Sequence, residues 1–201
     1  MEHLYLIVGL GNPGAEYART RHNAGFMLVE RVAGRWEAEW RLERKFDARL
    51  ALARRGGRAG LLCEPQTHMN ASGLAVAAVR DYYQVALGRV LVLVDDADLP
   101  LGELRLRARG SSGGHHGLAS VEQHLGSRGY ARLRMGIGRR AQDGREITDY
   151  VLSRFSAQEA VLFEKVLDRA AEQVACWLDE GIQAAMNKYN GVLETPPTNG
   201  N

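Results

Sequence analysis

His22, Asp95 and Asp96 are the residues of this chain whose types could do chemistry together. His22 comes shortly after the first apolar run of the chain, and the two aspartates end a later one. A neutral histidine can take a proton from water, while a carboxylate fixes its tautomer and stabilises the imidazolium. The side-chain amides of Asn12 and Asn70 could orient the water or donate to a developing oxyanion, although both residues also fit ordinary turn and cap positions. Together these residues predict hydrolysis of an activated carbonyl.

The elements that must position these residues alternate along the chain. Apolar runs and periodicity predict strands at 4–8, 46–53, 59–63, 90–94, 103–109 and 133–137, and helices at 23–36, 70–85, 118–125 and 157–178. This order predicts a single α/β domain over residues 1–190, with a mixed, largely parallel twisted sheet and helices on both faces. Residues 191–201 are expected to form a flexible tail. Ligands of such sheets bind at the carboxyl ends of strands, where Asn12, Asp95 and the loop 110–117 should meet.

Composition fits one enzyme-sized domain with no membrane segment. The chain has 201 residues, of which 45% are hydrophobic and 25% charged, which is enough for one well-buried core. Cys63 and Cys176 show no ligand-like spacing and are expected to be buried free thiols. No signal peptide precedes the first strand, and no apolar run approaches the ~20 residues of a membrane span. We therefore expect a cytoplasmic protein.

The net charge is only +2, but arginines are concentrated in one window. Residues 105–145 hold nine arginines against Glu122 and Asp143. Alternation in the strand 103–109 predicts that Arg105, Arg107 and Arg109 share one face. Such a basic field attracts phosphate backbones, whereas the excess of 23 Arg over 3 Lys could equally reflect codon usage. Charge alone leaves nucleic-acid binding open.

Three other patterns suggest different chemistry, and each lacks a required partner. Gly9 to Gly14 matches G-x-G-x-x-G, but the acid near the required distance, Glu30, is placed inside a helix rather than at the end of a second strand. Gly110 to Gly114 matches G-x-S-x-G, but the required order of acid and then histidine does not follow it. The six histidines show no paired metal-ligand spacing. Dinucleotide binding, a serine nucleophile and a metal site are therefore disfavoured.

Six segments taken together closely resemble the bacterial-type peptidyl-tRNA hydrolases, over nearly all of residues 4–190. They are LIVGLGNPGAEY at 6–17, TRHNAG at 20–25, MNASG at 69–73, DLPLG at 98–102, GGHHGL at 113–118 and RLRMGIG at 132–138. Enzymes of this family cleave the ester between a peptide and the 3′ ribose of tRNA. The resemblance implies the same activity here, on peptidyl-tRNA as the partner, with no metal or cofactor.

The resemblance also implies roles for individual residues. His22 falls on the general base, and Asp95 rather than Asp96 falls on the carboxylate that holds it, from the D-x-x-D-L-P spacing; alternation along a strand allows only one of the two to face the site. Asn12 falls on the amide that helps distinguish peptidyl from free aminoacyl esters. The remaining positions are Tyr17 and Asn70, which would contact the tRNA end or the peptide, and Arg105, Arg107, Arg132 and Arg134, which would meet tRNA phosphates.

Two residues of the expected substrate pocket depart from the family pattern. His68 stands where phenylalanine is common, and His116 stands where the usual G-G-H-N-G has asparagine. An imidazole loses its acceptor when it is protonated, whereas an amide always keeps both donor and acceptor. The expected result is activity that falls more steeply below pH ~6.5 than in a His116→Asn variant.

The leading hypothesis is a monomeric esterase that uses water as nucleophile on peptidyl-tRNA. The alternative is a catalytically weakened or inactive RNA-binding relative of the same fold, for which His68 and His116 leave room. A third possibility is a hydrolase of small esters or amides, which would have no use for an arginine face. Ionic strength separates this third possibility from the first, because binding that neutralises several phosphates weakens steeply with salt.

Overall fold

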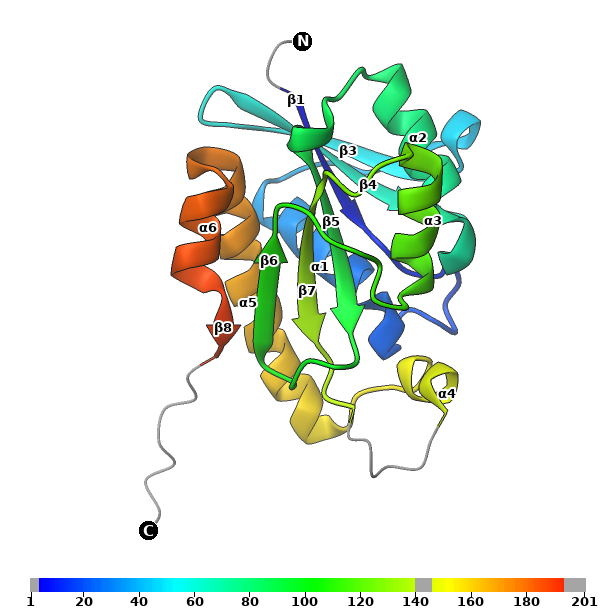
Figure 1. The fold of residues 1–201 in the computed structure, drawn as a ribbon, viewed down its shortest axis with the longest axis vertical. Helices are drawn as coiled ribbons and strands as arrows, with labels where there is room; N and C mark the ends of the chain where they lie inside the picture. Colours follow the sequence, from blue (N-terminus) through cyan, green and yellow to red (C-terminus); the bar gives the residue numbers. More distant parts are fainter. Residues whose placement is uncertain (1–3, 140–145, 194–201) are drawn as a thin grey trace.

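A computed structural model describes residues 4–139 and 146–193, which form one α/β domain around an eight-stranded sheet. The strand order is β2-β3-β4-β1-β5-β7-β6-β8 (Figure 1). The strands are β1 (Leu4–Gly9), β2 (Arg41–Glu43), β3 (Ala48–Arg55), β4 (Arg58–Pro65), β5 (Val90–Asp96), β6 (Glu103–Arg107), β7 (Ala131–Gly136) and β8 (Gly191–Val192). Strands β4, β1, β5 and β7 at the centre are parallel, and antiparallel strands extend both edges. The predicted mixed sheet is confirmed, with its parallel part at the centre.

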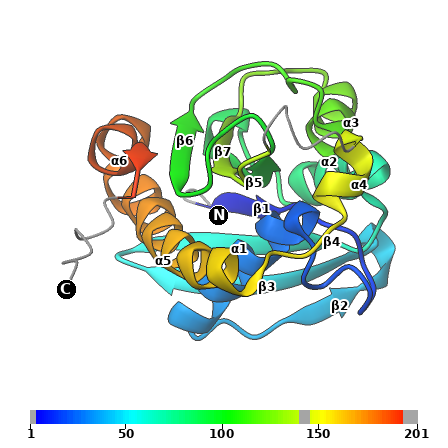
Figure 2. The same cartoon turned by 90° about the horizontal axis from the view of Figure 1, so that it is seen from below.

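Helices cover both faces of this sheet. They are α1 (Ala24–Arg35), α2 (Ser72–Tyr82), α3 (His116–Leu125), α4 (Ile147–Val151), α5 (Ala157–Glu180) and α6 (Ile182–Tyr189), with short 3-10 turns at Arg21–Asn23, Arg44–Phe46, Met69–Ala71 and Leu87–Arg89. Helices α1 and α5 pack on one face, and α2 and α3 pack on the other (Figures 1 and 2). The predicted arrangement of helices on both faces is therefore confirmed.

The central strands are buried on both sides, which explains their unbroken apolar runs. In β5, Leu91 and Leu93 belong to the core under α1 and α5, whereas Val92 and Val94 belong to the core under α2. Asp95 continues the alternation of Leu91 and Leu93, so its side chain leaves the strand on the side of α1. The sheet thus ends in a carboxylate directed toward the segment that starts α1.

The structure corrects three expectations about element ends. Asn70 is not a helix cap, because it lies within a 3-10 turn and no side chain caps α2. The strand expected at 103–109 ends at Arg107. The tail expected from residue 191 is wrong at its start, since the backbone of β8 pairs with β6 and places Val192 opposite Glu103. Residues 194–201, the rest of that expected tail, lie outside the described residues.

The two cysteines are as the composition predicts. Cys63 and Cys176 are free and buried, as predicted. No helix in the described part of the chain combines the length and apolar character that crossing a membrane requires.

Candidate active site

His22 is held beside the end of β5 by the close start of α1. It lies in the 3-10 turn Arg21–Asn23, directly before that helix. At Gly25, in the first turn of α1, an added Cβ would lie 2.2 Å from the Leu93 carbonyl oxygen and 2.5 Å from the Leu10 nitrogen. Only glycine permits this approach, because a contact under 3 Å with backbone atoms cannot be relieved by a side-chain movement.

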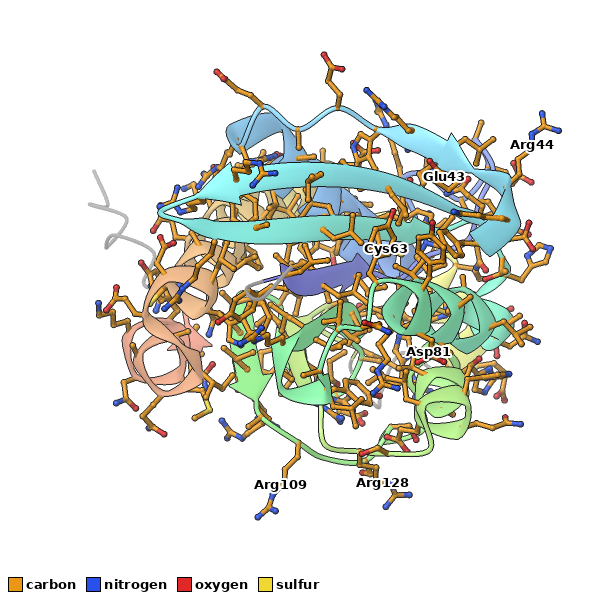
Figure 3. All side chains as sticks on the ribbon, turned by 90° about the horizontal axis from the view of Figure 1, so that it is seen from above. Glu43, Arg44, Cys63, Asp81, Arg109 and Arg128 are labelled. Atoms are coloured by element: carbon orange, nitrogen blue, oxygen red, sulfur yellow. The ribbon has the colours of Figure 1, made fainter. Side chains whose placement is uncertain are left out.

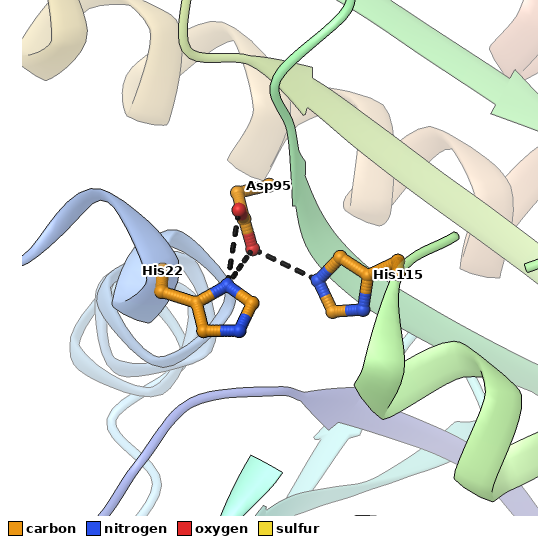
Figure 4. Close-up of side chains that lie close together, drawn as sticks. All are labelled: His22, Asp95 and His115. Carbon is orange, nitrogen blue, oxygen red and sulfur yellow. Dashed lines mark hydrogen bonds and ion pairs between the residues drawn. The ribbon is translucent and has the colours of Figure 1, made fainter. Parts of the chain in front are cut away.

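Asp95 bridges two imidazoles at this point (Figure 4). His22 Nδ1 lies 3.0 Å from Asp95 Oδ1 and 3.1 Å from Oδ2, and His115 Nε2 lies 2.9 Å from Oδ1. An ionised carboxylate only accepts hydrogen bonds, so both facing nitrogens must carry hydrogens. Neutral His22 is therefore the Nδ1–H tautomer, in which Nε2 carries the lone pair and has no hydrogen-bond partner among the described residues.

The carboxylate is buried, and it remains ionised because of the histidines. Asp95 is 2% exposed. Burial alone would raise the pKa of Asp95, but the imidazoles of His115 and His22 outweigh it and hold that pKa well below its ordinary value. The group therefore serves as a permanent acceptor that orients His22.

These residues line a cavity of about 280 Å³. The cavity brings together seven of the residues expected from the sequence: Asn12, His22, His68, Asn70, Asp95, His116 and Arg134. It is also lined by His115 and Met69, which lie in segments that the sequence placed near the site but to which it gave no role, and by part of α4, which the sequence did not predict. Tyr17 is not among the lining residues, and its expected contact with substrate stays a prediction.

Asn12 is fixed by three hydrogen bonds. Its backbone N–H donates to Asn23 Oδ1 at 2.9 Å, and Asn23 Nδ2 donates back to the Asn12 carbonyl at 2.9 Å. The side-chain Oδ1 of Asn12 accepts from the Met69 N–H at 2.8 Å. This bond uses Oδ1 and leaves Nδ2 as the donor that the side chain can offer to a substrate.

The histidines and Asp95 also raise the question of a metal. The ligand atoms of His22, Asp95 and His115 all lie within 4.8 Å of one another, close enough to share an ion. However, His115 Nδ1 accepts a hydrogen bond from the Leu118 N–H at 3.2 Å. A metal on Nε2 would move the ring hydrogen to Nδ1, where it would face that N–H. The contacts fit a hydrogen-bonded relay better than a metal centre.

Similarity to known proteins identifies the family of this chain. The model of the peptidyl-tRNA hydrolase family matches residues 6–197. The peptidyl-tRNA hydrolase of Synechococcus sp. (strain JA-2-3B'a(2-13)) is 48% identical over 187 residues, which cover 93% of this chain and 83% of that protein. This chain belongs to the peptidyl-tRNA hydrolase family.

Further relatives support membership of the same family. The peptidyl-tRNA hydrolase of Bacillus cytotoxicus is 43% identical over 185 residues, covering 92% of this chain and 98% of that protein. The crystal structure of peptidyl-tRNA hydrolase from Acinetobacter baumannii matches with a TM-score of 0.88 at 35% identity, covering 96% of this chain and 97% of that one. Family membership thus covers both the sequence and the fold.

The four arginines expected to contact tRNA phosphates differ in their surroundings. Arg105 and Arg107 are exposed on β6, on the face predicted from alternation. Arg134 lines the cavity, where its guanidinium bonds Asp96 at 3.1 Å and the carbonyl oxygens of two serines. Beyond β6, Arg109 points away from the molecule on the same side as Arg128 (Figure 3).

The expected contact of Arg132 with a tRNA phosphate is wrong. Arg132 is 1% exposed, and its guanidinium donates to the carbonyl oxygens of Gly110 and Ser111 at 2.5 and 3.2 Å and to those of Arg128 and Tyr130. A buried guanidinium with four carbonyl partners cannot also meet a phosphate, so Arg132 instead supports the glycine-rich loop. The expectation failed because β7 is buried on both faces.

Proposed function

We propose that this protein hydrolyses the ester between a peptide and the 3′ ribose of tRNA, with His22 as general base. The observation that carries the proposal is the His22–Asp95 pair at the wall of the cavity, with Nε2 of His22 left free. Family membership supplies the substrate class.

Each residue near the pair has a part in this reaction. His22 Nε2 removes a proton from water, the water oxygen bonds to the ester carbonyl carbon, and the bond to the ribose 3′ oxygen breaks. The proton on His22 passes to that leaving oxygen. Asp95 stabilises the imidazolium between these steps, and the amides of Asn12 and Asn70 donate to the peptide or to the developing oxyanion.

The substrate-binding residues extend this proposal beyond the reacting atoms. His68 and His116 contact the peptidyl end, and Tyr17 contacts the tRNA end. Arg105 and Arg107, with Arg134 at the cavity, meet tRNA phosphates. The protein acts as a monomer in the cytoplasm.

The decisive experiment measures release of N-acetyl-amino acid from N-acetyl-aminoacyl-tRNA. Wild type should turn over this blocked substrate and not the unblocked aminoacyl-tRNA, because a free α-amino group marks a substrate that must be spared. His22→Ala should abolish turnover while tRNA binding persists.

Two other outcomes would contradict this proposal. Absence of wild-type turnover, with tRNA still bound in a salt-sensitive way, would contradict the proposal and support the RNA-binding relative. Turnover of a small ester that is insensitive to salt would support the third possibility.

A further inference from the structure

Both ring nitrogens of His115 make hydrogen bonds, each to a different part of the protein. His115 is the residue before helix α3, and its Nδ1 accepts from the N–H of Leu118, three residues later, as an N-cap side chain does. Its Nε2 lies 2.9 Å from Asp95 Oδ1. A nitrogen that accepts a hydrogen bond cannot carry the ring hydrogen, so the backbone of α3 fixes the hydrogen of this imidazole on Nε2.

We propose that His115 is a positioning residue for the hydrolysis: α3 locks its tautomer, and its Nε2–H fixes Asp95 in the orientation that holds His22. The inference rests on the proposed function of His22. His115 donates to the carboxylate and takes no proton during the reaction, which distinguishes its role from that of His22.

The geometry around Asp95 shows why a second donor matters. Oδ1 receives hydrogens from both imidazoles, while Oδ2 faces only His22, at 3.1 Å. The torsion that turns a carboxylate about its last bond is soft, so a single donor fixes its plane poorly. Two donors from different segments restrict the carboxylate to one orientation. In that orientation His22 Nδ1 lies within hydrogen-bond distance of both carboxylate oxygens.

The second donor also limits how strongly Asp95 holds the proton of His22. A hydrogen bond from His115 draws part of the carboxylate charge away from His22. Without it, the carboxylate would stabilise the imidazolium more, and His22 would lose its proton only at higher pH. The acid limb of the pH–rate profile should therefore move to higher pH when the donor is lost.

The other charged or titratable groups near the pair bond other partners or line the cavity. Asp96 is paired with Arg134 at 3.1 Å. His68, His116 and Asp98 line the same cavity. Among the described residues, only the imidazoles of His22 and His115 bond the Asp95 carboxylate.

Two substitutions separate the bond to Asp95 from the helix cap. His115→Asn keeps an acceptor oxygen at the position of Nδ1 for the Leu118 N–H, but its side chain is too short to donate to Asp95. His115→Gln places an amide nitrogen near the position of Nε2 as a donor, but it offers no cap. We expect the asparagine variant to lower kcat by about 10- to 100-fold and to shift the acid limb upward. The glutamine variant should regain most of the lost kcat, and its melting temperature should be lower than that of wild type because the cap is missing.

The opposite pattern would overturn the proposal. If His115→Asn retains the wild-type kcat and acid limb while His115→Gln loses activity together with melting temperature, His115 serves only as a cap.

A measurement without substrate keeps this test separate from the proposed function. Histidine 15N NMR of wild type should show Nε2 of His115 protonated and Nδ1 unprotonated, and the titration of His22 should shift to higher pH in His115→Asn. The other tautomer, or an unchanged His22 titration, would overturn the inference even if the enzyme turns over peptidyl-tRNA. If wild type did not turn over, these spectra would still decide the coupling.

Discussion

Glu64, at the end of β4, is a buried acid that the proposed reaction does not use. Its side chain is 4% exposed and lies 2.6 Å from an Arg49 Nη1, which also contacts Glu30. Burial is the largest influence and raises the pKa of Glu64 to about 7, although Arg49 acts in the opposite direction. The carboxyl group is therefore easier to protonate in the folded protein than in the unfolded chain.

This shift predicts how stability depends on pH. Because the pKa rises from 4.5 to about 7 on folding, the contribution of Glu64 is fully present below pH 4.5 and is lost as pH rises through about 7. The loss amounts to about 3 kcal/mol at most. Glu64→Gln should flatten the decline of the unfolding free energy across this range, measured by urea denaturation at several pH values. The exposed Glu39→Gln serves as control, and equal slopes for Glu64→Gln and wild type would contradict the prediction.

Some site residues could be predicted from the sequence because strand ends meet at one edge of a parallel sheet. This rule brought Asn12 and Asp95 together, and the cavity contains both. The loop that carries His115 was also predicted to lie at this edge, but His115 received no role because a lone imidazole in a glycine-rich loop has no distinctive spacing. Its place just before the apolar helix that includes Leu118 was the available signal, since that is an N-cap position. The pH effect expected of His116, which is exposed in the cavity, stays a prediction.

At the scale of elements, Arg21 joins the turn that carries His22 to the segment around α4. Its guanidinium bonds Glu159 at 2.8 Å and Ser153 Oγ at 3.2 Å, and its backbone N–H bonds the Ser153 carbonyl at 2.9 Å. The same guanidinium lies over the rings of Tyr150 and Phe155, 4.6 and 4.7 Å from their centroids. Since α4 forms one wall of the cavity, this arginine couples that wall to the base.

Replacing Arg21 should therefore affect substrate binding as well as stability. Arg21→Met keeps an apolar stem but loses the ion pair, and we expect the unfolding free energy to fall by about 1–3 kcal/mol. KM should rise several-fold, because the wall formed by α4 is no longer fixed. Steady-state kinetics and urea denaturation would measure both, with the exposed Arg154→Met as control. Unchanged KM in a destabilised Arg21→Met would reduce Arg21 to a purely structural role.

The number of residues in an element decided whether the sequence could predict it. The long helices α1 and α5 and the buried strands have enough residues for a period to be visible. Helix α4 has five residues and β8 has two, too few for any period. Such short elements depend on contacts from elsewhere, as α4 depends on Arg21, and these contacts are separated by more than a hundred positions along the chain.

At the scale of the whole molecule, the acidic and basic regions have different surroundings. Some acidic side chains of α5 form ion pairs with arginines of α1. Arg31 pairs with Glu164 and Asp168, and Arg35 also pairs with Asp168. On β6, near the opposite edge of the sheet from β2, the exposed Arg107 has no carboxylate partner among the described residues. Arg107 is thus free of competition from a carboxylate despite a net charge of only +2, whereas Arg105 on the same strand bonds Glu103 at 3.0 Å.

This difference predicts the response to salt. The plot of log kcat/KM for peptidyl-tRNA against log salt should be steep, and Arg107→Gln should reduce its slope by about 0.7–0.9, the value for one phosphate contact. Arg41→Gln, on the far edge strand β2, removes the same charge and should leave the slope unchanged. Equal effects of the two substitutions would show that net charge, rather than the face of β6, attracts the tRNA.

Helix α5 has a consequence for how this protein is made. His22, Asp95 and His115 all precede residue 116, but the sheet face next to α1 is completed by the buried side of α5, which follows much later in the chain. During synthesis this apolar face stays uncovered until α5 has left the ribosome, and domains generally fold as units. The site that these three residues form is therefore completed late in synthesis, only after α5 can pack on the sheet.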